Sequence, residues 1–540
     1  MARGRTWVSR REFLALAAGG VAAAALDGCA SGSRHASTSS TAARNRTTGS
    51  ASSSSSSSTT SSPAPKPSLS TLARQLSGPL LLPLSAGYPA AARLYNPRFD
   101  ALAHPAAIAL CASAADVVAC VRFAAAGGAP LRLRAGGHSY GGWSTGEGLV
   151  ADVSNMSAVT VDTAGGSVRI GAGARLVDVY TALGARGVAI AAGSCPTVGI
   201  TGLTLGGGIG VLSRAFGLTC DAVRSAQIVT ADGRLREVDA RTDADLFWAL
   251  RGGGGGSFGA VTALTMAVRP APSVQTFFLP WDFAHAESVV GAWQNWTSSA
   301  DNRLWSTCKL LADPNRGALS ARVAGTWIGP PAELQAQLSA LRSKIDAPPS
   351  TVQIQSLAYA DAMLLEAGCS RQSAAECVAN SLSPAKRRPF AATSAILSSA
   401  LPADGIAAAA QGVRAGLEVP NMVEGGVSFD ALGGAVAAVA SSDTAFVHRS
   451  ALASMQYSAT WPSMSAGTGQ VSTAPFDAYA HGLRAAMARW TGQAAYVNYA
   501  DSQIVEFGDA YWGANYLRLQ AVKKRYDPDN LLTFPQAVRA

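Results

Sequence analysis

The sequence has few charged residues: they fill 14% of its 540 positions, whereas hydrophobic residues fill 48%. A chain of this length and composition can bury a large core, and its length suggests two to four domains. The net charge of +9 does not indicate nucleic-acid binding, because residues 1–70 alone hold eight Arg or Lys and only two Asp or Glu. The rest of the chain has no basic run and no RNA-binding signature, so we expect no nucleic-acid partner.

Several common site motifs are also missing. No CxxC pair and no His-Cys cluster has the spacing of metal ligands, so we predict no metal site. Glycine runs are frequent, but no Gly-Lys-Ser/Thr follows them. No strand-GxGxxG-helix unit with its downstream acid is placed correctly either, which argues against both P-loop and nicotinamide sites. The apolar run 14–26 is too short to span a bilayer.

Residues 1–29 have the form of a twin-arginine export signal, in which Ser9-Arg10-Arg11-Glu12-Phe13-Leu14 precedes the apolar run. A plain signal peptide with chance arginines is the alternative. Leu26-Asp27-Gly28-Cys29 resembles a lipobox, although aspartate is unusual before the glycine, and simple cleavage nearby is equally open. We expect an exported protein, extracellular or lipid-anchored at the outer face of the cell membrane, with membrane contact only through a lipid at Cys29.

Residues 30–72 are mostly Ser, Thr and Ala, with an unbroken serine run at 52–58. Such a stretch has too little apolar surface to offset its ordering entropy, so it predicts a disordered tether. Eight cysteines in an exported chain also raise the question of disulfides. Cys369 and Cys377 are the best candidates for a disulfide, whereas Cys111 and Cys120, on a strand and the following helix, are expected to be buried free thiols.

From Tyr95 onward, short apolar runs alternate with helical patterns, which indicates mixed helices and strands. The strand expected at 131–134 leads directly into Gly136-Gly137, where backbone N–H groups can approach a pyrophosphate. Asp232-Gly233 predicts a hairpin turn. We expect further strands at 107–111, 148–153, 168–171, 425–432 and 454–461, and helices at 115–126, 175–187 and 331–346.

Two glycine-rich strings hold the residues that we expect to bind a cofactor. One reads Arg134-Ala-Gly-Gly-His138-Ser-Tyr140-Gly-Gly, and the other runs from Gly193-Ser-Cys195-Pro-Thr-Val198 to Gly210. Glycine lets backbone N–H groups come close to phosphates, and an imidazole and a thiol supply two nucleophiles able to tether an isoalloxazine ring. Taken singly, His138 is more typical of a turn or core histidine, and Cys195 of a buried thiol.

Together these strings resemble the berberine bridge enzyme-like branch of FAD-linked oxidases, in the vanillyl-alcohol oxidase superfamily. Its bicovalent members carry a histidine in R-x-G-G-H and a cysteine in G-x-C-x-x-V-G. The resemblance covers residues 90–540 and implies bicovalent FAD, held by His138 at the 8α-methyl carbon and by Cys195 at ring carbon C6. It implies further flavin contacts at Arg134, Gly136, Gly137, Ser139, Val198, Gly199, Thr201, Gly202, Gly207, Gly208, Gly210, Gly259, Val261, Tyr511 and Asn515.

The resemblance implies an α+β fold. A PCMH-type FAD-binding domain of two α/β subdomains covers 90–270, and a substrate domain with an antiparallel sheet backed by helices covers 271–475. The segment 476–540 is expected to return to the FAD domain, although Leu517, Leu519 and Val522 also fit a simple apolar helix face. His448-Arg449 resembles a family segment, and we interpret it as structural because it precedes a strand.

Oxidation of an alcohol by a flavin requires hydride transfer to N5 and removal of the hydroxyl proton by a base. Residues 495–499 match the family's Y-x-N-Y segment, and we interpret Tyr499 as that base. We expect a strand here, with Tyr499 and Asp501 on one side and Asn498 on the other. Because the phenol of tyrosine has a pKa of about 10, Tyr499 needs a lowered pKa or an assisting acid or second tyrosine.

Gln456 and Tyr457 are neighbours on a predicted strand and therefore face opposite sides, and the resemblance favours Gln456 as the substrate contact. Tyr140, beside the His138 string, is expected to shape the pocket or donate to the substrate. The tryptophans of the substrate domain, although able to stack on sugar rings, are more typical of core packing. They are Trp281, Trp293, Trp296, Trp305 and Trp327.

The resemblance implies a monomeric oxidase whose partners are O2 and a small molecule, with hydrogen peroxide as coproduct. The substrate is an alcohol group of a saccharide or a secondary metabolite. Val198 stands where the family gates oxygen, and its small branched side chain favours an oxidase. Two alternatives stay open: a dehydrogenase of the same superfamily with another acceptor, and a cell-surface binding protein that has lost catalysis.

Overall fold

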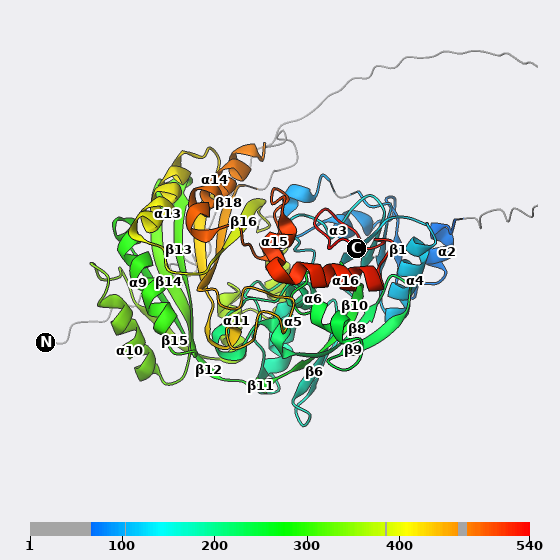
Figure 1. Cartoon of the computed structure of the whole chain (residues 1–540), viewed down its shortest axis with the longest axis horizontal. Helices are drawn as coiled ribbons and strands as arrows, with labels where there is room; N and C mark the ends of the chain where they lie inside the picture. Colours follow the sequence, from blue (N-terminus) through cyan, green and yellow to red (C-terminus); the bar gives the residue numbers. More distant parts are fainter. Residues whose placement is uncertain (1–65, 103, 384–385, 463–471) are drawn as a thin grey trace, which may run out of the picture. The chain divides into compact units, whose positions relative to one another are not determined.

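A small, mainly parallel sheet and a small antiparallel sheet precede a large antiparallel sheet along the chain (Figure 1).

The computed structural model describes residues 66–540 except 103, 384–385 and 463–471. The twin-arginine motif, the lipobox and the serine run lie outside these residues. The tether was predicted to extend to residue 72, but residues 69–73 form helix α2 (Leu69–Ala73), capped by Ser68 and anchored by the buried Leu72.

The first sheet has the order β1-β2-β4-β3 and is parallel except at its edge. Its strands are β1 (Leu80–Leu81), β2 (Ala107–Leu110), β3 (Leu131–Arg134) and β4 (Leu149–Asp152). Helix α3 (Tyr88–Ala92) precedes β2, and α4 (Ala114–Ala125) connects β2 to β3. The Ser113 hydroxyl caps α4 by accepting a hydrogen bond from the Asp116 backbone N–H. Strand β3 therefore ends where the His138 string begins.

The second sheet is antiparallel, with the order β5-β6-β10-β8-β9. Its strands are β5 (Val159–Asp162), β6 (Ser167–Gly171), β8 (Val223–Val229), β9 (Leu235–Asp239) and β10 (Ala260–Ala267). Helices α5 (Leu176–Gly184), α6 (Ile200–Leu205), α7 (Ser213–Phe216) and α8 (Ala244–Ala249) fill the connections, and β7 (Val188–Ala189) pairs with β11 (Arg269–Pro270). The predicted turn at Asp232-Gly233 joins β8 to β9, with Gly233 at a φ of 70°. The two subdomains of the predicted FAD domain are thus confirmed.

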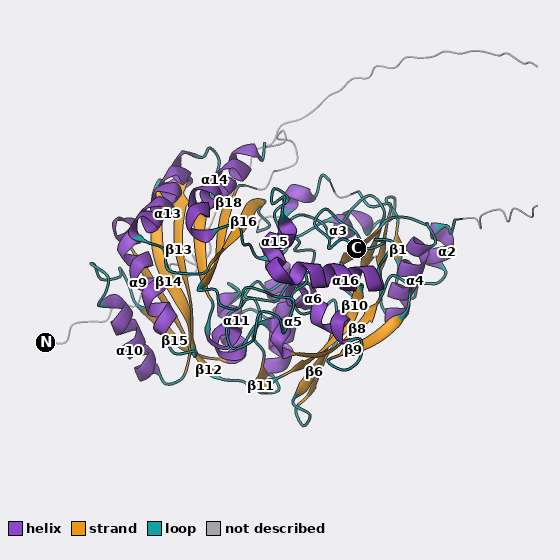
Figure 2. Ribbon diagram, in the orientation of Figure 1, coloured by secondary structure: helices purple, strands orange, loops and turns teal. Residues whose placement is uncertain are grey.

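The third sheet has seven antiparallel strands in the order β15-β12-β14-β13-β17-β18-β16. They are β12 (Ser273–Trp281), β13 (Leu304–Asp313), β14 (Ala318–Ile328), β15 (Gln353–Ala358), β16 (Phe390–Leu397), β17 (Glu424–Ala431) and β18 (Ala453–Thr460). Helices α9 (Ala286–Ser299), α10 (Pro331–Arg342), α13 (Ala403–Ala415) and α14 (Ala474–Thr491) cover one face (Figure 2). This confirms the predicted antiparallel sheet backed by helices.

Alternate residues of the central strands serve different purposes. Phe429 and Tyr457 belong to the core beneath the helices. Their neighbours on the opposite face align across the strands, since Gln456 pairs with Ser428 and Ser428 pairs with Lys309. The sheet therefore has an apolar face that packs against helices and a polar face on its other side.

The end of the chain packs against the FAD domain. Helix α15 (Phe507–Trp512) precedes α16 (Tyr516–Tyr526), and α16 contacts α8. The buried Lys523 ammonium pairs with Asp527 at 2.5 Å and donates to the Ser257 carbonyl. The predicted boundary at 475 cuts off α14 from its own sheet, because α14 packs on α13, β16 and β18. The returning segment therefore starts after Thr491.

The remaining predictions on cysteine and tryptophan are confirmed. Cys369, in the segment after α11 (Tyr359–Glu366), forms a disulfide with Cys377 in α12 (Ala374–Ser381), whereas Cys111 and Cys120 are buried free thiols with sulfur atoms 4.0 Å apart. All five tryptophans named above are buried. Among the described residues, no helix is both long and apolar enough to cross a membrane, and no group of three or more His, Cys, Asp or Glu side chains is arranged to hold a metal ion.

Candidate functional site

The two glycine-rich strings meet through their glycines. A Cβ added at Gly136 would lie 2.3 Å from the Gly199 nitrogen, and one added at Gly199 would lie 2.6 Å from the Gly136 nitrogen. Only two residues without side chains allow backbones to come this close. The contact brings His138 to the other string, where its Nε2 lies 2.9 Å from the Thr197 Oγ1. Gly136 and Gly199, both predicted to contact the flavin, thus join the two loops.

His138 and Cys195 share the same two neighbours. The Tyr95 ring stacks on the His138 imidazole, with centroids 3.7 Å apart and planes inclined by 19°. Tyr95 and Thr197 are also the side chains that act on the Cys195 thiol, because both lower its pKa against the larger effect of burial. The two predicted tethering residues therefore share Tyr95 and Thr197 as neighbours. Tyr95 and Thr197 were missed because their role depends on this tertiary contact, and the sequence motif carries no signal for Tyr95.

Burial controls the protonation of both tethering residues. It lowers the pKa of His138 to about 3, and the nearby Arg175 guanidinium acts in the same direction. The imidazole is therefore neutral at pH 7 and has one nitrogen lone pair for nucleophilic attack. Burial raises the pKa of the Cys195 thiol, while hydrogen bonds from Thr197 and from the Val198 backbone N–H act against that rise.

The three residues predicted to act in catalysis form one cluster. Gln456, on β18, donates from Nε2 to the Tyr140 hydroxyl at 2.8 Å. The Tyr140 ring stacks on the Tyr499 ring, with centroids 5.1 Å apart and planes inclined by 20°. Tyr457 is fully buried on the other face of the sheet, as predicted from strand alternation. The polar face of the large sheet therefore meets the His138 string at these side chains.

The prediction of a strand around Tyr499 is wrong. Val497–Tyr499 is a short 3-10 helix, closed by a hydrogen bond from the Tyr499 N–H to the Tyr496 carbonyl. The Asn498 side chain donates to the Leu203 carbonyl and to the Tyr496 hydroxyl, which fixes this turn. Asp501 pairs with His481 at 3.1 Å instead of lying beside Tyr499.

Tyr499 has an acidic neighbour that sequence reasoning missed. Burial raises the pKa of Tyr499 well above its usual value, and the charge of Asp430 raises it further. Asp430 lies on the polar face of β17, and burial raises its pKa while the Lys309 ammonium acts in the opposite direction. Strand alternation at 424–431 already places Asp430 on the same face as Ser428, but only the fold brings that face to Tyr499.

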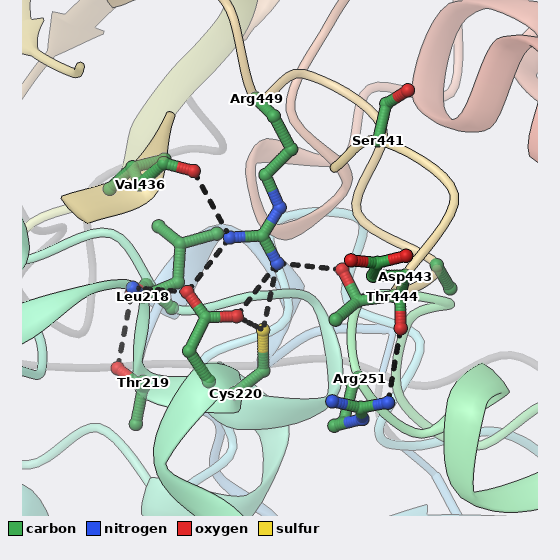
Figure 3. A network of polar contacts seen from close by, with 12 residues as sticks. Leu218, Thr219, Cys220, Arg251, Val436, Ser441, Asp443, Thr444 and Arg449 are labelled. Atoms are coloured by element: carbon green, nitrogen blue, oxygen red, sulfur yellow. Dashed lines mark hydrogen bonds and ion pairs between the residues drawn. The ribbon is translucent and has the colours of Figure 1, made fainter. Parts of the chain in front are cut away.

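Arg449 joins the large sheet to the FAD domain. Its guanidinium forms a two-point ion pair with Asp221, at 2.8 Å to Oδ2 and 2.7 Å to Oδ1, and also donates to the Thr444 hydroxyl (Figure 3). His448 lies 3.0 Å from the Ala495 carbonyl through Nε2. Both side chains are therefore structural, as predicted for His448-Arg449.

Two family models match the sequence. An FAD binding domain matches residues 105–239, and a domain described as berberine and berberine like matches residues 495–539. The uncharacterized FAD-linked oxidoreductase YgaK of Bacillus subtilis is 32% identical over 441 residues, which are 81% of this chain and 91% of that protein. The chain belongs to the berberine bridge enzyme-like family of FAD-linked oxidoreductases.

Solved structures of berberine bridge enzyme-like proteins share this fold. The wild-type BBE-like 1 of Physcomitrella patens superposes with a TM-score of 0.77 at 28% identity, covering 86% of this chain and 98% of that one. A carbohydrate oxidase from Microdochium nivale, in complex with a substrate analogue, superposes with a TM-score of 0.76 at 26% identity, covering 87% and 98%. The chain is therefore an FAD-dependent oxidoreductase of α+β, PCMH-type fold.

The glycine run of this berberine bridge enzyme-like protein is built differently from the prediction. The Gly208 and Ile209 N–H groups both donate to the Tyr496 hydroxyl, and the Gly210 N–H donates to Ser213. The Gly207 N–H donates to the Thr204 carbonyl. A Cβ added at Gly210 would lie 1.8 Å from the Ala192 carbonyl oxygen. Protein groups, rather than a phosphate, thus occupy the N–H groups of this run.

Other predicted flavin contacts are also engaged by the protein. The Ser139 hydroxyl accepts from the Trp143 N–H, and Gly259 and Val261 lie at the junction of β8 and β10. The Tyr511 hydroxyl bonds to Gln536 and to the Asp501 N–H, and Asn515 donates to the Ser441 carbonyl. These bonds hold the C-terminal segment in place, and a flavin contact by either residue stays a prediction.

A second group of polar side chains around the strings fits FAD. Arg134 donates from Nε to Asp152, but its other two guanidinium nitrogens are buried and have no hydrogen-bond partner among the described residues. The buried hydroxyls of Ser144, Thr145 and Thr201 likewise have no hydrogen-bond partner in this part of the chain. Such donors are expected where a ligand completes the bonding, as the pyrophosphate and ribityl chain of FAD would. Gly202, beside Thr201, faces open space, and Gly137 has the positive φ of 70°.

Proposed function

We propose that this protein is an oxidase with bicovalently bound FAD that oxidises an alcohol group and reduces O2 to hydrogen peroxide. The observation that carries the proposal is the contact of His138 and Cys195 with the same Thr197 and Tyr95. The 8α-methyl carbon and C6 belong to the same benzene ring of the isoalloxazine, so two tethering nucleophiles must be close neighbours. FAD, when bound, supplies a hydride acceptor at N5.

Tyr499 and Asp430 form the acid–base pair of the proposed reaction. A solitary phenolate is disfavoured here, because burial and Asp430 both raise the pKa of Tyr499. Tyr499 therefore accepts the substrate hydroxyl proton while its own proton passes toward Asp430, whose raised pKa makes it a better acceptor. Tyr140, held by Gln456, forms the adjoining wall of the site and orients the alcohol.

The polar face of the large sheet favours a saccharide over an apolar secondary metabolite. Arg322, Lys309, Ser428 and Gln456 align across four neighbouring strands on that face. Such a row offers hydrogen-bond donors and acceptors to several hydroxyl groups at once. The structural likeness to a carbohydrate oxidase points the same way. Val198, directly after Thr197 and half-buried, supports reaction with O2.

We also propose export by the twin-arginine route, on the basis of Arg10 and Arg11 before the apolar run. Replacement of both by Lys is expected to keep the protein in the cytoplasm. If residues 1–29 act instead as a plain signal peptide, the variant is still exported. Metabolic labelling with a fatty acid, compared between wild type and Cys29→Ala, separates a lipid anchor from simple cleavage.

The proposed function is tested on purified protein. Acid precipitation is expected to leave the flavin in the wild-type pellet, with one bond remaining in His138→Ala and one in Cys195→Ala. A panel of saccharides and phenolic alcohols with peroxide detection then identifies the substrate class. Flavin that is released entirely into the supernatant from the wild type contradicts bicovalent binding, and turnover with a dye but without peroxide indicates a dehydrogenase.

A further inference from the structure

Thr197 contacts both tethering residues from a fixed position. Its side chain is 1% exposed, and its Oγ1 lies 2.9 Å from the His138 Nε2. The Thr197 side chain and backbone also lower the pKa of the Cys195 thiol, against the larger effect of burial. The Pro196 and Val198 carbonyls on either side accept the N–H groups of Val177 and Leu176, so the loop is held against the start of α5.

A single threonine hydroxyl can serve both neighbours because it has one donor and two acceptor lone pairs. When it accepts the N–H of His138 Nε2, the lone pair of the imidazole is left on Nδ1. Thr197 lies two positions after Cys195, and its side chain lowers the pKa of that thiol, which acts against the larger effect of burial. The same hydroxyl is therefore placed to act on both nucleophiles.

The ring of Tyr95 completes this arrangement. It stacks on His138 at 3.7 Å and restricts the imidazole to one plane. With the plane fixed by Tyr95 and one nitrogen fixed by Thr197, the second nitrogen has only one direction in which to point. Tyr95 also lowers the pKa of the Cys195 thiol, so it acts on the same two residues as Thr197.

We propose that Thr197 is the positioning residue for both covalent bonds between this protein and FAD. The inference rests on the proposed bicovalent binding and deepens it. At His138, an N–H bond and one C–H bond of the 8α-methyl group would break and an N–C bond would form, and the two protons and two electrons released would pass to O2, giving hydrogen peroxide. At Cys195, the S–H bond and the ring C6–H bond break, an S–C bond forms, and a second O2 is reduced in the same way.

The test measures the bonds directly and not the activity. Wild type, Thr197→Val and Thr197→Ser are produced together, digested, and the flavin-bearing peptides of His138 and Cys195 are quantified by mass spectrometry. Valine has the shape of threonine without its hydroxyl, and serine keeps the hydroxyl. We expect at least an approximately tenfold loss of both linked peptides in Thr197→Val, the scale of one lost hydrogen bond to a charged group, and retention in Thr197→Ser.

Thr204→Val is the matched control, because Thr204 is equally buried but its hydroxyl bonds only to the Ile200 carbonyl within α6. It is expected to keep both linked peptides. Visible absorbance of bound flavin before digestion confirms that each variant is folded, and Thr197→Ala gives a second variant without the hydroxyl. Full linkage at both residues in Thr197→Val and Thr197→Ala overturns the inference. A wild type without any linked peptide instead contradicts the proposed function itself.

Discussion

The Arg449 guanidinium donates hydrogen bonds to both carboxylate oxygens of Asp221, at 2.8 and 2.7 Å, and both side chains are largely buried. Asp221 follows the glycine run of the FAD domain, whereas Arg449 lies between β17 and β18 of the large sheet. The ion pair therefore fixes the polar face of that sheet relative to the FAD-binding strings. Gln456 lies on that face and Tyr499 lies close to it. Loss of the ion pair is therefore expected to disturb the candidate site as well as the fold.

Replacement of Arg449 by Met is expected to lower the free energy of unfolding by about 3–5 kcal/mol, because Asp221 is left as a buried charge without its partner. Chemical denaturation followed by tryptophan fluorescence measures this loss. The double variant Arg449→Met/Asp221→Leu removes both charges and is expected to recover part of the stability. Equal stability of Arg449→Met and wild type would show that the pair contributes nothing net.

Tyr499→Phe is expected to lower kcat by about 10²–10⁴-fold, the usual contribution of a positioned base, with the flavin content unchanged. Steady-state kinetics with peroxide detection and the flavin absorbance of the same samples check both parts. Tyr457→Phe is the control, since the Tyr457 hydroxyl lies in the core beneath the helices. A Tyr499→Phe enzyme with wild-type kcat would remove Tyr499 from the reaction.

Lys309→Met is expected to move the acid limb of the kcat/KM profile to higher pH by about one unit, within the range that a lost opposite charge produces. Asp430 accepts the proton only when ionised, so activity is present above its pKa and is lost as the pH falls through it. The Lys309 ammonium lowers the pKa of Asp430, and its removal therefore raises that pKa. The two side chains are diagonal neighbours on one face, because Thr307 pairs with Asp430 and Lys309 pairs with Ser428.

Another carboxyl that interacts with Lys309 enters the same profile. Burial raises the pKa of Glu366 to about 7 while the Lys309 ammonium acts in the opposite direction, so Glu366→Gln should be measured beside Lys309→Met. Lys344→Met, in the exposed turn after α10, is expected to leave the acid limb in place. If Lys309→Met raises only KM and leaves the limb unmoved, Lys309 binds substrate and does not tune Asp430.

Gly136→Ala is expected to abolish covalent flavin, because the new Cβ meets the Gly199 nitrogen at 2.3 Å and separates the two strings. Acid precipitation measures the covalently bound flavin, and the thermal melting temperature measures the effect of separating the two strings on stability. Gly482→Ala is the control: it lies in α14 with open space around its Cβ position, so alanine there is expected to add about 0.5–1 kcal/mol of stability. Wild-type flavin linkage in Gly136→Ala would show that the loops can yield.

Local patterns predicted much of the fold. Strand β3 was expected at 131–134 and lies there, and alternation on β18 separated Gln456 from Tyr457 correctly. The closeness of Cys369 and Cys377 in one polar stretch of the sequence was enough to predict their disulfide. In each case the deciding interaction lies within a few residues or follows from the period of one strand.

The predictions that did not hold depend on contacts between residues that are far apart in the sequence. A glycine at 208 or 210 indicates a close approach but does not say what approaches: a Cβ added at these positions would meet Thr219 and Ala192, and a flavin contact by either glycine stays a prediction. The turn at Tyr499 is held by Leu203, nearly three hundred positions earlier in the chain. Asp430 likewise reaches the site only when β17 is aligned beside β18. Such contacts depend on tertiary packing, which outweighs local strand preference.

The alternation along β13, β17 and β18 separates the demands of folding from those of recognition. Every second side chain packs against the helices, and those between lie on the polar face that bears Gln456 and Asp430. Mutational libraries confined to the positions on the polar face can therefore vary the substrate selectivity of the enzyme while the hydrophobic core beneath the helices stays constant. Divergence among paralogues can follow the same path, with new substrates acquired at little thermodynamic cost.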